Sequence, residues 1–178
     1  EKRLGRKYRL PHEYEWEFAC RSNMPQAFSV GELIDSKHAN IRADQPYWDA
    51  PAGVALKRSR TVGSYPPNGF GLYDMHGNVA EWCDDWYAPR PYNRQLYSWN
   101  FKSKTSADTV QLLEEFSEAV KGAERRHYLN PESPRQGETR ILRGGSFLGD
   151  VASCRSAARR HQNPEYRHRT IGFRVVCE

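Results

Sequence analysis

The spacing of apolar positions predicts only a few regular elements in this chain. Residues 12–21 predict a short helix, because Trp16 and Cys20 recur at helical spacing and acids fill its first half, where the helix dipole favours them. Residues 103–121 predict a second, amphipathic helix with one apolar stripe. Residues 170–177 alternate between apolar and polar positions and are rich in β-branched residues, so they predict a closing strand.

A long segment between these elements predicts irregular structure. Residues 27–67 are rich in Pro, Gly, Asn and Asp and show little period, and a short strand is expected only at residues 61–68. Long irregular segments in compact domains are usually functional or are pinned by ions. Asn40, Asp44 and Asp49 are candidates for such pins, and simple turn formation is the alternative.

Residues 69–87 are the stretch around which the chain is organised. Their glycines permit turns with positive φ, and Asp74, Asn78 and Glu81 offer the oxygen ligands that a hard cation such as Ca²⁺ prefers. The alternative is a turn that leads into a buried, aromatic-rich strand or short helix. Further along, residues 140–147 predict a strand that enters a glycine bend.

Composition narrows the class of protein. The 178 residues are 38% hydrophobic and 12% aromatic, which predicts a sizeable core built largely on aromatic side chains. The formal net charge of +5 permits an acidic partner and does not by itself indicate nucleic acid. No apolar run approaches the roughly 18 residues of a membrane span. No signal-peptide pattern is visible either.

The cysteines carry no metal or redox motif. Cys20, Cys83, Cys154 and Cys177 are widely spaced and form no CxxC pair, so neither a zinc ribbon nor a thioredoxin-like site is indicated. Each is expected to act as a small buried hydrophobic residue, and the redox compartment stays undetermined.

Four motifs, in matching order, resemble the formylglycine-generating-enzyme (sulfatase-modifying factor) family. They are RLPHEYEWEFA at 9–19, VGSYPPNGFGLYDMHGNVAEW at 62–82, LRGGS at 142–146 and IGFRV at 171–175. The resemblance implies an α+β, C-type-lectin-like fold with low regular secondary-structure content, in one domain over residues 1–178. It leaves the family's N-terminal portion unmatched and makes residues 103–122 a helical insertion.

The resemblance also implies structural calcium. The site carried over consists of the side chains of Asp74 and Glu81, the backbone carbonyls of Gly77 and Val79, and Asn78 nearby. A weaker second site would use Asn40 and Ile41. That site lacks the family's usual acid, because Val54 stands in its place.

Catalytic copper is not expected. Family members that make formylglycine hold copper(I) through a cysteine pair shortly after Gly-Gly-Ser, because soft thiolates suit that ion. Here Gly149 stands in the place of the first cysteine, and Cys154 is an imperfect match to the second. Cys154 and Ser146 are therefore only weak catalytic candidates, and the chain is predicted to lack copper oxidase activity.

The C-terminal residues 154–176 resemble the variable proteins of diversity-generating retroelements, in which exposed positions of a fixed framework bind ligand. The corresponding candidates are Phe147, Leu148, Asp150, Ala152, Arg160, His161, Gln162, Tyr166, His168 and Arg169. Arg, His and Tyr side chains suit an anionic or aromatic ligand, either a protein or a small molecule. A solvated basic face is the alternative.

Two other functions compete with ligand binding. One is an iron- or copper-dependent oxidoreductase with His76, His161 and His168 as ligands. The other is nucleic-acid binding through residues 57–60 and 155–174, which the modest charge makes the weakest of the three. The resemblance favours a soluble domain of bacterial or phage type. Oligomeric state, compartment and ligand identity are not determined by the sequence.

Overall fold

The computed structural model describes residues 6–89 and 134–177. The helix expected at residues 103–122 lies outside these residues. The elements, in chain order, are β1 (Tyr8–Arg9), α1 (Glu13–Arg21), β2 (Ala80–Trp86), β3 (Arg140–Arg143), the 3₁₀ helix η2 (Val151–Cys154), β4 (Arg160–Gln162), β5 (Ile171–Gly172) and β6 (Val176–Cys177).

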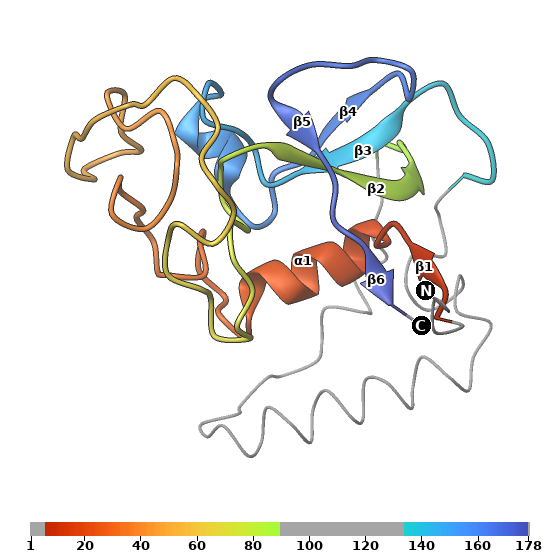
Figure 1. Ribbon diagram of the computed structural model, residues 1–178, viewed down its shortest axis with the longest axis horizontal. Coiled ribbons are helices and arrows are strands. Elements are labelled where there is room, and N and C mark those ends of the chain that lie inside the picture. Colours follow the sequence, from red (N-terminus) through yellow and green to blue (C-terminus); the bar gives the residue numbers. More distant parts are fainter. Residues whose placement is uncertain (1–5, 90–133, 178) are drawn as a thin grey trace, which may run out of the picture.

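One small sheet and one helix form the regular framework. The sheet has the strand order β4-β3-β2-β5, in which β2 runs antiparallel to β3 and parallel to β5. A separate two-stranded sheet pairs β1 with β6, which brings the two ends of the described chain side by side. The helix α1 lies below the four-stranded sheet, and the long loop of residues 27–67 lies to its left (Figure 1). The expected α+β fold with little regular structure is confirmed.

Helix α1 begins where a distant strand provides an acceptor. The Asp85 carboxylate on β2 accepts a hydrogen bond from the amide of Glu13 at 2.6 Å. The Glu15 carboxylate accepts one from the amide of His12 at 2.8 Å. These bonds satisfy amides that have no acceptor within the helix, so both sequence and tertiary structure fix its start.

The segment 61–68 contains no strand, contrary to the sequence prediction. Side chains organise its backbone instead of a strand partner. The Asn68 Oδ1 atom accepts hydrogen bonds from the amides of Phe70 and Leu72, both at 3.0 Å, and its Nδ2 atom donates to the Ala19 carbonyl at 2.7 Å. Asparagine competes well for backbone groups in this way and favours turns over strands.

The expected closing strand is also interrupted. Residues 171–172 pair with β2, whereas residues 176–177 pair with β1, and the three residues between them belong to no strand. Cys177, expected to be buried, is exposed on this short edge strand. Cys20, Cys83 and Cys154 are buried as predicted.

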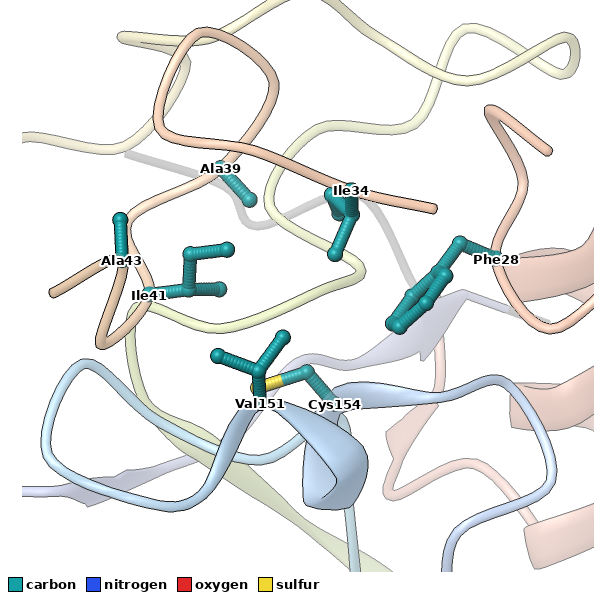
Figure 2. Packing of buried hydrophobic residues seen from close by; sticks show 7 residues of the cluster. All are labelled: Phe28, Ile34, Ala39, Ile41, Ala43, Val151 and Cys154. Carbon is teal, nitrogen blue, oxygen red and sulfur yellow. The ribbon is translucent and has the colours of Figure 1, made fainter. Parts of the chain in front are cut away.

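Two apolar clusters stabilise the fold. The first gathers Phe28, Ile34, Ala39, Ile41, Ala43, Val151 and Cys154, and Figure 2 shows how η2 directs Val151 and Cys154 toward the long loop. The second gathers Trp16, Cys20, Met75, Cys83 and Ile141 beneath the sheet. The irregular loop therefore holds its shape by burying its own apolar side chains against η2.

Charged groups are buried where α1 meets the sheet. Arg143 on β3 is fully buried, pairs with the Glu17 carboxylate and lies 3.6 Å from that of Glu13. Its guanidinium also donates to the carbonyls of Ser156, at 2.8 Å, and Ala158, at 2.6 Å. Buried ions persist only when they are paired and hydrogen-bonded in this manner.

Candidate calcium pocket and ligand-binding surface

A tight turn places the oxygen atoms of the organising stretch. Asp74, Gly77 and Asn78 all have positive φ, at 57°, 75° and 56°. The Gly77 amide donates to the Gly144 carbonyl, and the Asn78 amide donates to the Asn40 carbonyl, both at 2.8 Å. The turn is thus tied both to the glycine bend after β3 and to the long loop.

A pocket of about 330 Å³ opens beside this turn. Its lining residues are Val62, Gly71, Leu72, Tyr73, Asp74, Asn78, Val79, Glu81, Phe173 and Arg174. Four of the five predicted calcium residues therefore lie at one pocket, and Gly77 is next to them in the chain. Val62 and Phe173 are strongly exposed at its mouth.

The two carboxylates of the pocket have different partners. Glu81 is buried and accepts hydrogen bonds from Trp16 Nε1 at 2.6 Å and from Arg174 Nε and Nη2 at 2.5 and 2.8 Å. Asp74 is half-buried, and its Oδ2 atom accepts a hydrogen bond from the Gly63 amide at 2.7 Å. Its Oδ1 atom has no hydrogen-bond donor among the residues that the structure describes.

The donor set fits Ca²⁺ in kind, since it offers carboxylate, amide and carbonyl oxygens. Within residues 6–89 and 134–177, no three His, Cys, Asp or Glu side chains come together as a metal site. A calcium ion here would therefore depend on two carboxylates together with backbone carbonyls. The Arg174 guanidinium shares the pocket, and its charge opposes that of a cation.

The weaker site at Asn40 and Ile41 contains an unusual buried oxygen. The Asn40 Nδ2 atom donates to the Arg58 carbonyl at 2.9 Å and to Asn78 Oδ1 at 3.1 Å. Its Oδ1 atom is buried without a hydrogen-bond partner in the described part of the chain. Such an oxygen is costly unless a donor or a cation reaches it. The side chain of Ile41 points into the first core cluster.

The C-terminal candidates lie on the surface with one clear exception. Asp150, Arg160, His161, Tyr166, His168 and Arg169 are exposed, and Leu148, Ala152 and Gln162 are half-buried. Phe147, expected to be exposed, is only 1% exposed. Its ring packs inside, and the Arg169 guanidinium lies above it at 5.7 Å from the ring centroid. Phe147 therefore supports the surface and does not form it.

Ring stacking orders part of this surface. The His161 ring stacks on Tyr87 with centroids 3.7 Å apart, and Tyr166 stacks near His168 at 6.1 Å. His168 Nδ1 is 2.7 Å from the Thr170 hydroxyl. Sequence reasoning missed Tyr87, because it lies more than seventy positions earlier in the chain, directly after β2. No local pattern would have linked the two rings.

The described arginines differ in whether they pair with a carboxylate. Arg9, Arg159 and Arg174 each pair with a glutamate, as does the buried Arg143. Arg160, Arg167 and Arg169 are exposed, and no carboxylate among the described residues pairs with them. Arg167 was not among the ligand-binding residues predicted from the sequence, yet its exposure places it with the surface arginines.

The weak catalytic candidates are buried. Cys154 is fully buried, and burial raises the pKa of its thiol to about 12. The Cys20 thiol pKa is likewise raised to about 12 by burial. A thiol in such surroundings stays protonated at neutral pH and is a poor nucleophile or copper ligand. Ser146 is also buried, and its hydroxyl oxygen accepts a hydrogen bond from the Gly149 amide at 3.3 Å.

The three candidate metal-binding histidines are not brought together. His76 is buried, with Nδ1 2.8 Å from the Cys154 carbonyl and Nε2 3.0 Å from the Ser29 amide. Burial lowers the pKa of His76 to about 4, so the ring is neutral. His161 and His168 lie on the surface instead. Both ring nitrogens of His76 are already engaged, which makes it a core residue.

A family model decides the relationship that the motifs suggest. The sulfatase-modifying factor enzyme 1-like domain matches residues 2–178. The chain belongs to this family. Its membership confirms the resemblance of the four motifs and agrees with the turn-rich fold around β2.

Three relatives match nearly all of this chain over less than half of their own length. The serine/threonine-protein kinase pkn1 of Chlamydia pneumoniae is 34% identical over 170 residues, covering 94% of this chain and 20% of that protein. The formylglycine-generating enzyme of Mus musculus is 29% identical over 177 residues, covering 96% of this chain and 39% of that protein. The structure of Treponema denticola variable protein 1 superposes with a TM-score of 0.56 at 27% identity, covering 94% and 46% of the two chains.

No helix among the described residues is both long and apolar enough to cross a membrane.

Proposed function

We propose that the chain is a ligand-binding domain of the sulfatase-modifying factor family, which takes an anionic or aromatic group on the surface formed by residues 160–169. The observation that carries this proposal is that three exposed arginines without a carboxylate partner among the described residues occur within residues 160–169. Arg160, Arg167 and Arg169 have no carboxylate partner among the described residues, whereas Arg174 and others do. An anion would gain charge-assisted hydrogen bonds here without breaking an existing ion pair.

The aromatic stacks add a second kind of contact. His161, Tyr166 and His168 lie in the same segment as the unpaired arginines; His161 stacks on Tyr87, and Tyr166 stacks near His168. Stacking already orders these protein side chains. Little of their conformational entropy is therefore lost when a ligand ring packs against them. The similarity to Treponema denticola variable protein 1 supports this surface as the variable, ligand-binding part of a retroelement-type protein.

The alternative function is a metal-dependent oxidoreductase. The burial of the Cys154 thiol argues against this function. A copper(I) site needs a thiolate pair, whereas Cys154 is a buried thiol with a raised pKa and Gly149 precedes it in place of a cysteine. For iron, His76 would have to leave two hydrogen-bonding partners in the core. The ligand-binding proposal requires neither change.

Phenyl phosphate is a suitable probe, because it joins a dianion to an aromatic ring. We expect calorimetric titration to show binding that the double variant Arg160→Gln/Arg169→Gln weakens by at least about tenfold. Titrations with phenol alone and with inorganic phosphate alone would show how much the ring and the charge each contribute to binding. Arg42→Gln is a control for the loss of an arginine elsewhere, since this half-buried arginine lies in the long loop near Asp44. Absence of binding for all three probes, or equal weakening by the control, would overturn the proposal.

We also propose that the pocket beside the turn holds a structural calcium ion. Asp74, Glu81 and Asn78 would provide side-chain oxygens, with the carbonyls of Gly77 and Val79 beside them, and the unpartnered Asn40 Oδ1 marks a weaker second position. Calcium at one hundred times its dissociation constant would stabilise the fold by about 2.7 kcal/mol.

The calcium test compares melting temperatures in calcium and in chelator. The wild-type chain is expected to melt at a higher temperature in calcium, and Asp74→Asn is expected to remove most of this difference. Glu32→Gln, which removes an exposed acid of the long loop outside both proposed ion positions, should retain it. Identical melting of the wild-type chain in calcium and in chelator contradicts the site.

A further inference from the structure

The Arg174 side chain lies in the pocket and forms an ion pair with the Glu81 carboxylate, which calcium would also use. Its Nε and Nη2 atoms bond to the two oxygens of Glu81, and Nη2 also donates to the Tyr73 carbonyl at 3.1 Å. With Trp16 Nε1 on the same carboxylate, every oxygen of Glu81 has at least one donor. A calcium ion would therefore meet a carboxylate that is already neutralised.

We propose that Arg174 is an internal competitor for the cation, which pairs with Glu81 in the calcium-free protein and leaves that carboxylate when calcium binds. The inference rests on the calcium site proposed above and concerns its regulation. A calcium ion and a guanidinium group on one carboxylate would repel each other, and two of the residues that line the pocket, Val62 and Phe173, are strongly exposed. Calcium affinity would then include the free energy of breaking the Arg174–Glu81 pair.

The position of Arg174 in the chain permits such a movement. It lies between β5 and β6, in the three residues that belong to neither strand. Its neighbours Phe173 and Val175 are 69% and 51% exposed, so neither anchors the segment in the core. The guanidinium can move toward solvent while β5 stays paired with β2. Trp16 Nε1 can keep its bond to Glu81, because it belongs to α1 and not to the segment that holds Arg174.

Arg174→Gln tests the inference directly in the 178-residue chain. Removal of the competing charge should lower the calcium dissociation constant by about tenfold or more, measured by calorimetry with calcium chloride. Arg155→Gln is the control for the same change in net charge, since Arg155 is exposed at the end of η2 and outside the pocket. It should leave the dissociation constant unchanged.

The outcomes separate this inference from the calcium site itself. Equal calcium affinity in Arg174→Gln and wild type, or weaker affinity in the variant, refutes the competitor role and leaves the site intact. Failure of both to bind calcium refutes the site. If Arg174→Gln does not fold, the wild-type chain still gives an answer through NMR of the arginine Nε–H groups. Calcium should shift the Arg174 Nε–H resonance toward the position of a solvated arginine, and an unchanged resonance in calcium-loaded protein would refute the movement.

Discussion

At the scale of single residues, Gly77 shows why the organising stretch tolerates little change. Its φ is +75°, and a Cβ atom at this position would lie 2.4 Å from the Asn40 carbonyl oxygen and 2.8 Å from the Ile41 side chain. The close approach is what allows the neighbouring Asn78 amide to reach that same carbonyl oxygen. Gly71 has the same φ, yet nothing lies within 4 Å of its missing Cβ.

This contrast predicts different costs for one substitution. Gly71→Ala should destabilise the fold by about 1 kcal/mol, the strain of a left-handed alanine. Gly77→Ala should cost about 3 kcal/mol or more, because it adds a clash with backbone that cannot move aside freely. Urea denaturation of both variants measures the difference. Equal losses would show that the turn relaxes around the methyl group.

At the scale of elements, the start of α1 depends on a strand far along the chain. The Asp85 carboxylate accepts a hydrogen bond from the Glu13 amide and lies 3.4 Å from the His12 ring nitrogen. The hydrogen bond to Asp85 raises the pKa of His12 above 6.5, against the effect of burial. His76 behaves in the opposite way, since burial lowers its pKa to about 4.

The two histidines predict that the free energy of unfolding passes through a maximum as the pH changes. A different histidine causes the decline on each side of this maximum. A raised folded-state pKa stabilises the fold below the unfolded value of 6.5, and this gain is lost as the pH rises through the folded pKa of His12. A lowered pKa means that the unfolded chain binds the proton more tightly, so stability falls as the pH drops from 6.5 toward 4 through His76. Urea titrations across this range measure both sides.

His12→Gln isolates the first effect. We expect the variant to be less stable than wild type near pH 6, and to approach wild type at pH values well above the folded pKa, where His12 is neutral. Asp85→Asn should also abolish this pH dependence, because it removes the charge that His12 faces. A constant difference between His12→Gln and wild type at all pH values would count against the His12–Asp85 pair.

At the scale of the whole molecule, a buried ion network joins α1 to the sheet. Arg143 of β3 faces Glu13 and Glu17 of α1, and Arg159 adds a second guanidinium to Glu13 at 2.6 Å. The Arg143 side chain is fully buried, as is that of Glu13. Removal of one member would therefore leave an opposite charge unpaired in the interior.

Arg143→Ala is expected to destabilise the fold by about 3–5 kcal/mol, the usual cost of breaking a buried ion pair. Arg140→Ala, at the start of the same strand β3, is the matched comparison, because its pair with Asp84 is partly exposed. It should cost about 1 kcal/mol or less for the ion pair. Denaturation midpoints and slopes would measure both, and similar losses would show that the network is more hydrated than its burial indicates.

The sequence by itself determined the local elements and the family. Spacing of Trp16 and Cys20 defined α1, and glycines with oxygen-bearing side chains marked the turn around Asp74, because both depend on neighbours within a few residues. The four motifs carried the fold class, which membership of the sulfatase-modifying factor family confirms. From the sequence, the acidic residues of α1 were expected only to favour the start of the helix.

Only the tertiary structure decided which charged groups are paired. The Arg174–Glu81 pair spans 93 positions, and Glu17 meets Arg143 across 126. Phe147 was expected at the surface, and it is buried because Arg169 and the turn at Asn78 come together over it. Whether a side chain is buried or ion-paired depends on contacts with segments far away in the chain. A local sequence pattern does not show these contacts. The sequence therefore specified several residues of the pocket, while the fold placed Arg174 among them.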